Sequence, residues 1–164
     1  PREVLPIATV TSAFVNMILT FIVVFGVVII AGRGIHIHAM LCLPIVMIVE
    51  YILCLGIALI VSSITVYLRD LQYILGIFVM ALQYLTPVMY GVDMVENSGA
   101  GYWLVFLFNL NPMTPIIRIY RQIIYYGEVP ELHSLLLALI VGIVFIVIGE
   151  VMFKKLQKGF AEEF

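Results

Sequence analysis

Charge is what this sequence has least of. Charged residues make up 11% of the chain, while hydrophobic residues make up 64%. A soluble domain carries about 25% charged and about 45–50% apolar residues. Because so few charges could not cover the apolar surface of a soluble fold of this length, we expect lipid to surround much of the chain. The formal net charge of -2 supplies no basic surface, so we expect no nucleic acid among its partners.

The usual sequence marks of an enzyme site are also missing. There is no G-x-x-x-x-G-K-S/T phosphate loop, no Cys/His cluster of zinc type and no G-x-S-x-G nucleophile elbow. His36 and His38 are more typical of a short interfacial loop than of a metal site. Cys42 and Cys54 are twelve positions apart, about 18 Å along one helix, whereas a disulfide needs Cα atoms within about 7 Å. The sequence therefore predicts no catalytic residues, no metal and no enzymatic activity.

Long runs without charge define four expected membrane spans. They cover residues 4–32, 41–68, 71–92 and 132–153. Glu50 is the only charge inside the second run, and Glu150 near the end of the last run has the i,i+4 spacing to Lys154 that predicts an ion pair. A helix needs about 20 residues to cross a hydrocarbon core of roughly 30 Å. Short polar breaks separate the runs at 33–40, at Arg69 and Asp70, and at 93–101, and a charged tail follows at 154–164. We therefore predict an all-α integral membrane protein forming a single transmembrane domain over residues 1–164.

The segment 102–131 does not fit a simple span. Its apolar start is short, and Asn111, Pro112 and Pro115 then interrupt any helix. Arg118 and Arg121 would cost several kcal/mol each on a helix facing lipid. We predict an outer re-entrant hairpin of two short helices, at 102–109 and 113–125, that lines a cavity, because broken backbone at membrane depth must be covered by protein or water. An amphipathic hairpin lying on the membrane surface is the alternative.

The distribution of positive charge predicts the topology. With four spans, both ends of the chain lie on one side of the membrane, together with Arg2, Arg69 and three lysines of the tail, Lys154, Lys155 and Lys158. The other side carries only three arginines, and positive charge favours the cytoplasm. We therefore expect a multi-pass protein of the cytoplasmic (inner) membrane with both termini cytoplasmic.

Five short strings, in order along nearly the whole chain, resemble the permease subunit of ABC-2 type exporters of polysaccharides such as O-antigen, capsule and teichoic acid. They are PREVLP at 1–6, VYLRDL at 66–71, YLTPVMY at 84–90, NPMTPIIRIYR at 111–121 with Gly127 and Pro130 after it, and FKKLQKGFAEEF at 153–164. Members of that family usually have six spans, so the resemblance implies that this chain is the C-terminal part of a longer subunit, without the first two spans. It also implies a homodimer of permeases with two ABC ATPase subunits, which hold the ATP and magnesium; this chain itself needs no cofactor.

The expected function is ATP-driven export of a polysaccharide or lipid-linked glycan across the cytoplasmic membrane by a permease embedded in membrane lipid. Two alternatives stay open: an ABC-2 exporter of drugs or other small hydrophobic substrates, and a membrane scaffold that transports nothing. A scaffold needs neither charged residues at membrane depth nor a broken pair of helices, and this sequence predicts both.

The candidate site residues fall into two groups. Charged residues of the cytoplasmic turns are candidates for contact with the ATPase, with solvated loop anchors as the alternative: Arg2, Glu3, Arg69 and Asp70. An acid within a span is a functional candidate by default, although a hydrogen bond between Glu50 and Tyr, Ser or Thr on a neighbouring helix is the slightly favoured interpretation. Aromatic rings can stack on the C–H faces of sugars, while a lipid-facing aromatic belt is the alternative. The candidates for the translocation path or outer gate are therefore Glu50, Tyr84, Pro87, Tyr90, Phe106, Phe108, Asn111, Pro112, Arg118, Tyr120 and Arg121.

Overall fold

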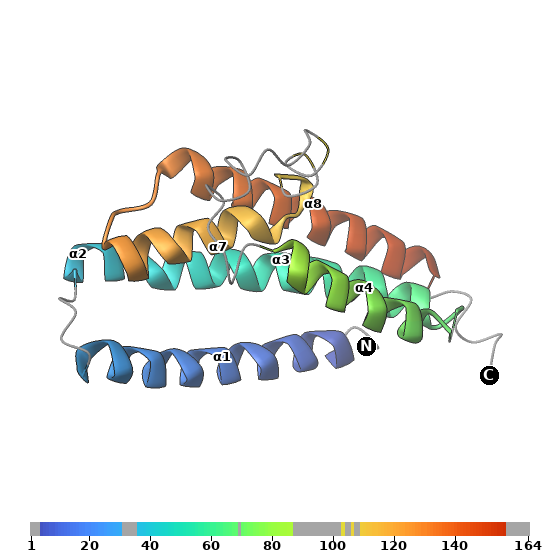
Figure 1. Cartoon of the computed structure of the whole chain (residues 1–164). Coiled ribbons are helices and arrows are strands. Elements are labelled where there is room, and N and C mark those ends of the chain that lie inside the picture. Colours follow the sequence, from blue (N-terminus) through green and yellow to red (C-terminus); the bar gives the residue numbers. More distant parts are fainter. Residues whose placement is uncertain are drawn as a thin grey trace.

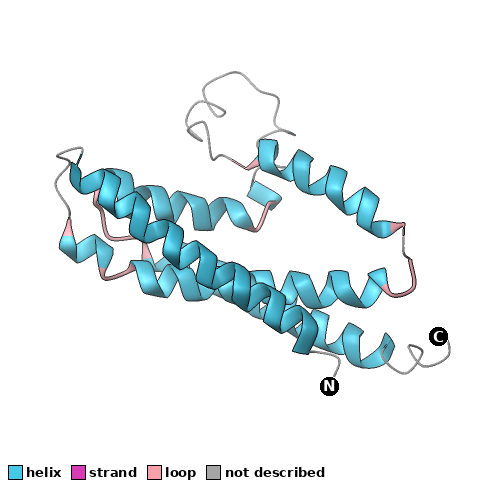
Figure 2. Ribbon diagram, turned by 90° about the horizontal axis from the view of Figure 1, so that it is seen from below, coloured by secondary structure: helices cyan, strands magenta, loops and turns pink. Residues whose placement is uncertain are grey.

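The computed structural model describes residues 4–30, 36–68, 70–86, 103, 106 and 109–156, which form helices joined by short turns and no strand (Figures 1 and 2). The elements are α1 (Val4–Ile30), α2 (Ile37–Met40), α3 (Leu43–Thr65), α4 (Leu71–Leu85), α7 (Met113–Arg121), the π-helix η1 (Gln122–Tyr126) and α8 (Leu132–Leu156). The predicted all-α membrane fold is confirmed. The sequence predicted only a polar break at 33–40, but a short helix, α2, occupies its end.

Three of the described helices are long and apolar enough to cross a membrane: α1, α3 together with the end of α2, and α8. The predicted third span corresponds to α4, which has 15 residues, about 22 Å, and the predicted end of that span at residue 92 lies outside the described residues. The start of α1 and the end of α8 lie at the same end of the molecule in both ribbon views (Figures 1 and 2).

Glycines bring α3 and α8 into close contact. A Cβ atom added at Gly56 would lie 2.6 Å from the backbone of Phe145 and Ile146, and one added at Gly149 would lie 2.9 Å from the carbonyl oxygen of Gly56. A Cβ at Gly142 would lie 3.0 Å from Ile52. Lipid supplies no hydrophobic force that pushes helices together, so membrane helices associate by close packing, which small residues permit. These three glycines therefore fix the distance between α3 and α8.

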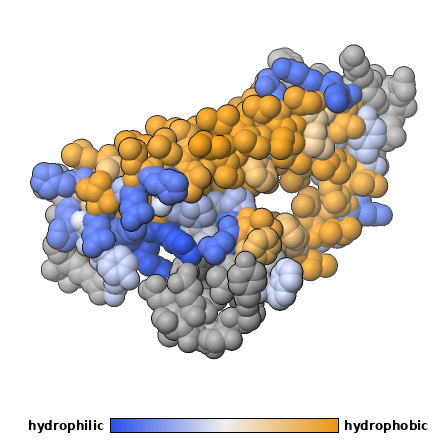
Figure 3. Space-filling model, turned by 90° about the horizontal axis from the view of Figure 1, so that it is seen from above, coloured by the Kyte–Doolittle hydropathy of each residue, from blue (hydrophilic) through white to orange (hydrophobic). Residues whose placement is uncertain are grey.

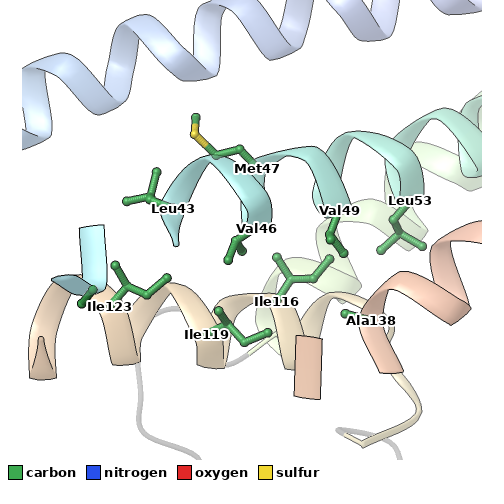
Figure 4. Packing of buried hydrophobic residues seen from close by; sticks show 10 residues of the cluster. Leu43, Val46, Met47, Val49, Leu53, Ile116, Ile119, Ile123 and Ala138 are labelled. Carbon is green, nitrogen blue, oxygen red and sulfur yellow. The ribbon is translucent and has the colours of Figure 1, made fainter. Parts of the chain in front are cut away.

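The short helix α7 packs into this helical core. Ile116 and Ile119 of α7 and Ile123 of η1 are buried against α3 and α8. Figure 4 shows these side chains pointing toward a row of apolar residues on α3 and toward Ala138 of α8. The α3 residues in this cluster are Leu43, Val46, Met47, Val49 and Leu53. α7 has nine residues, about 14 Å, and is too short to cross the membrane.

By contrast, α1 is attached to the rest along one side only. None of its residues is buried. It contacts α3 through a hydrogen bond of 2.9 Å between Thr11 Oγ1 and the Tyr51 hydroxyl, and Phe14 lies against the Tyr51 ring with 4.9 Å between centroids. Most of its apolar side chains remain exposed, so α1 offers a large surface to lipid or to another subunit.

We predict that Gly56→Leu destabilises the protein by about 1–3 kcal/mol, because the new side chain would overlap the α8 backbone and overpacking of this kind costs that much. Gly76→Leu in α4 is the matched control, since a Cβ there meets no heavy atom within 4 Å. Thermal unfolding of both purified variants in detergent micelles measures the difference. Equal midpoints would show that the α3–α8 contact is not tight.

Candidate functional site

One hydrogen bond anchors α7 to the middle of α3. The hydroxyl of Tyr120 on α7 donates to Oε2 of Glu50 on α3 at 2.6 Å. The Tyr120 ring also stacks on Phe21 of α1, with centroids 5.4 Å apart. Glu50 thus has a tyrosine partner on a neighbouring helix, as one of the two interpretations of the sequence predicted. Tyr120 joins three helices that are far apart in the chain.

A second polar contact joins the end of α4 to the start of α7. Nδ2 of Asn111 donates to Oγ1 of Thr86 at 2.9 Å, and the backbone N–H of Met113 donates to Oδ1 of Asn111 at 3.0 Å. Thr86 is extended (φ -88°, ψ 128°), as expected for a residue before proline, and this ends α4. Figure 1 shows α4 and α7 following one another alongside α3, and both contact α3. The two helices therefore form an interrupted pair that meets at the Asn111–Thr86 contact.

Thr86 was not among the residues singled out from the sequence. Its position before Pro87, at the end of an apolar run, was the available signal. Asn111 was singled out, and in the structure it stabilises the start of a helix. Its side chain accepts a hydrogen bond from an N–H at the start of α7 that the helix itself leaves without a partner.

A hollow of about 700 Å³ lies between α7 and α8; we call it the α7–α8 hollow. Arg118 lines it, and its Nη2 donates to Oδ1 of Asn109 at 3.3 Å. Thr114, Gln122, Glu131 and Ser134 add further polar groups. Seen from above (Figure 3), hydrophilic side chains gather at the end of the molecule where Figure 1 places η1 and the start of α8. The predicted hairpin residues therefore border a hollow that contains several polar groups within an otherwise apolar protein.

The other site residues predicted from the sequence that the structure describes lie outside these two polar contacts, and most of them lie outside the hollow. Pro112 lines the hollow, whereas Arg121 is half-buried on α7 and is not part of the lining. Tyr84 is exposed near the end of α4, and Phe106 is exposed beside Trp103 in an edge-to-face contact of 6.4 Å. Asp70 is the N-cap residue of α4 without a capping hydrogen bond from its side chain. The other candidates lie outside the described residues: Arg2, Glu3, Arg69, Pro87, Tyr90 and Phe108.

Sequence reasoning also missed a contact at the turn after η1. Gly127 ends η1 with φ 67°, a left-handed conformation that glycine adopts without strain. A Cβ atom at this position would collide with the imidazole of His36. His36, which lies between α1 and α2 in the chain, therefore packs directly on the turn after η1.

We predict that Tyr120→Phe destabilises the protein by about 1–3 kcal/mol, because it keeps the ring on Phe21 but leaves the Glu50 carboxyl without its donor. Tyr73→Phe is the control, since Tyr73 is an exposed tyrosine of α4. Thermal unfolding in micelles gives the stability, and hydrogen exchange of the α7 amides shows whether α7 has loosened. No change in either measurement would mean that the hydrogen bond does not hold α7 in place.

Comparison with known proteins places these features in a family. The family described as ABC-2 type transporter matches residues 2–125. Two relatives from Klebsiella pneumoniae, each named an O-antigen export system permease protein, are 26% and 25% identical over 162 residues, which is 99% of this chain and 60% of the relative. A relative of the same name from Myxococcus xanthus is 25% identical, over 99% of this chain and 61% of the relative. This chain thus spans about three-fifths of the length of these curated relatives. Since the family match covers most of the chain, the protein is a multi-pass membrane protein that belongs to the ABC-2 type transporter family.

Proposed function

We propose that this chain forms part of the permease subunit of an ATP-driven exporter that moves a polysaccharide or lipid-linked glycan across the cytoplasmic membrane. The observation that carries the proposal is the match to O-antigen export permeases over 99% of the chain. The fold supports it, because α4 and α7 form an interrupted pair beside α3 and the α7–α8 hollow carries polar groups in an otherwise apolar protein. Such arrangements are typical of transport proteins, where broken helices line a path.

The proposal includes two further kinds of subunit contact. The permease works as a homodimer, which would cover part of the exposed apolar surface of α1. A separate ABC ATPase binds ATP and magnesium and drives transport. The charged residues Arg2, Glu3, Arg69 and Asp70 would contact it; of these, the structure describes Asp70, at the start of α4.

We expect charge reversal at the first turn, Arg2→Glu or Glu3→Lys, to lower transport-coupled ATP hydrolysis several-fold, because each puts like charges opposite one another at the subunit contact. Glu128→Lys, at the other end of the molecule, is the control. The assay uses the subunit expressed from its complete gene and reconstituted with its ATPase. Wild-type hydrolysis in both first-turn variants, at normal membrane insertion, would contradict the contact.

The proposed topology has both chain ends in the cytoplasm and the segment 102–131 returning to the outer side without crossing. We expect a cysteine at Lys158 to react with a membrane-impermeant maleimide only after cells are permeabilised. A cysteine at the exposed Glu128 should react in intact cells. Labelling of the position 158 cysteine in intact cells would overturn the topology.

Export itself tests the role of the hollow. We predict that Arg118→Ala lowers the amount of glycan at the cell surface by about tenfold, the effect of losing one hydrogen bond from a charged donor. Arg118→Lys should recover only part of the loss, because lysine keeps the charge but not the planar set of donors. Lys154→Ala, which removes an exposed ion pair with Glu150 at the other end of α8, should export normally. Full export by the Arg118→Ala variant would remove the hollow from the transport path.

A further inference from the structure

The α7–α8 hollow has two chemically different walls. Thr114, Arg118 and Gln122 of α7 and η1 line it at intervals of four residues, so they lie on one face of that helical segment. Leu137, Val141 and Phe145 line it from α8 at the same interval. Pro115 and Ile119 of α7 and Ser134 of α8 also line the hollow. Polar groups therefore predominate on the α7 side and apolar groups on the α8 side, and a molecule between them must match both.

Thr114, on the polar side of the hollow, has a hydroxyl group without a hydrogen-bond partner among the described residues. Its side chain is buried, with 1% of its surface exposed. Leaving a buried hydroxyl without a partner is unfavourable, whereas a bound molecule with hydroxyl groups could both donate to it and accept from it. Thr114 lines the hollow, but its Oγ1 atom is itself almost fully covered, so a molecule bound in the hollow would reach this hydroxyl only after a small shift of the neighbouring side chains.

The charges of the hollow favour an uncharged ligand. Arg118 and Glu131 are its charged lining residues, one of each sign, and its uncharged polar lining residues are Asn109, Asn111, Thr114, Gln122 and Ser134. A phosphate group would meet the Glu131 carboxylate, and an acyl chain would leave the polar groups of α7 unsatisfied. A sugar residue carries hydroxyl groups along its edge and C–H groups on its faces, which suits the two walls together. The volume of about 700 Å³ lies within the roughly 300–1,000 Å³ typical of small-molecule sites.

We propose that the α7–α8 hollow binds a short uncharged segment of the exported glycan. The sugar hydroxyls bond to Thr114, Arg118 and Gln122, and the C–H faces lie on Leu137, Val141 and Phe145. This inference rests on the proposed export function and adds to it a place within the subunit where the substrate is held.

Photo-crosslinking in cells that make the glycan tests the site. A photo-reactive amino acid is placed at Leu137, which lines the hollow, or at Ile143, which lies on the opposite side of α8 by helix geometry. The two side chains are 47% and 48% exposed, so they form a matched pair. We expect glycan adducts at position 137, few or none at position 143, and none at either position in cells unable to make the glycan. Lipid adducts alone at position 137, or equal glycan adducts at both positions, would overturn the proposal.

The variant Thr114→Val distinguishes a ligand-binding role of this hydroxyl from a structural one, because the two roles predict different effects on stability and on glycan capture. Replacing an unpartnered buried hydroxyl with a methyl group should leave the thermal midpoint of the purified protein unchanged or raised. The same variant should lower glycan capture at position 137 by about two- to tenfold, the effect of losing one hydrogen bond. A lowered midpoint with undiminished capture would show that the hydroxyl serves the fold and not a ligand.

These outcomes separate the site from the function. If glycan export depends on the subunit but position 137 captures none, the binding site is wrong and the export function stands. If deleting the subunit leaves glycan export unchanged, the export function itself is wrong.

Discussion

The close approach of α3 and α8 is the constraint on which the other contacts depend. Gly56, Gly142 and Gly149 let the two backbones pack without intervening side chains, and this gives a stable pair in surroundings that offer little hydrophobic driving force between helices. α7 then fits against both helices through Ile116 and Ile119. A wider α3–α8 pair would separate the apolar surfaces that bury α7 and would also change the width of the hollow beside it.

Polar contacts determine how α7 is held once it is packed. The Tyr120–Glu50 hydrogen bond fixes the last turns of α7 to α3, and the Asn111–Thr86 bond fixes its start to the end of α4. Within an apolar protein an unsatisfied polar group costs more than the net gain of a satisfied one, so these bonds specify position more than they add stability. They leave another face of α7 turned toward the hollow, where Arg118 and Gln122 supply donors and acceptors.

The unequal attachment of the helices suits a transport subunit. α3, α8 and α7 form the packed part, whereas α1 has no buried residue and α4 exposes most of its large apolar side chains, such as Ile77 and Phe78. The exposed apolar side chains of α1 and α4 can contact lipid, while α7 is packed against α3 and α8. In the export function proposed above, a substrate in the α7–α8 hollow would lie beside this packed part.

The sequence by itself determined the membrane class, the approximate position of every described long helix and the break at Asn111 and Pro112. These features depend only on neighbouring residues, namely the length of a run without charge and the effect of proline on the helix around it. It also offered a hydrogen bond to Tyr, Ser or Thr as one of two interpretations of Glu50, and it predicted the Glu150–Lys154 pair. It could not identify which of the nine tyrosines bonds to Glu50. It also did not single out Thr86 or Gly127, and it did not predict that polar residues of α7 face apolar residues of α8 across the hollow. Those features required the tertiary structure, because they depend on which faces of helices distant in the chain pack together, and a nearly uniform apolar sequence has too little periodicity to mark those faces.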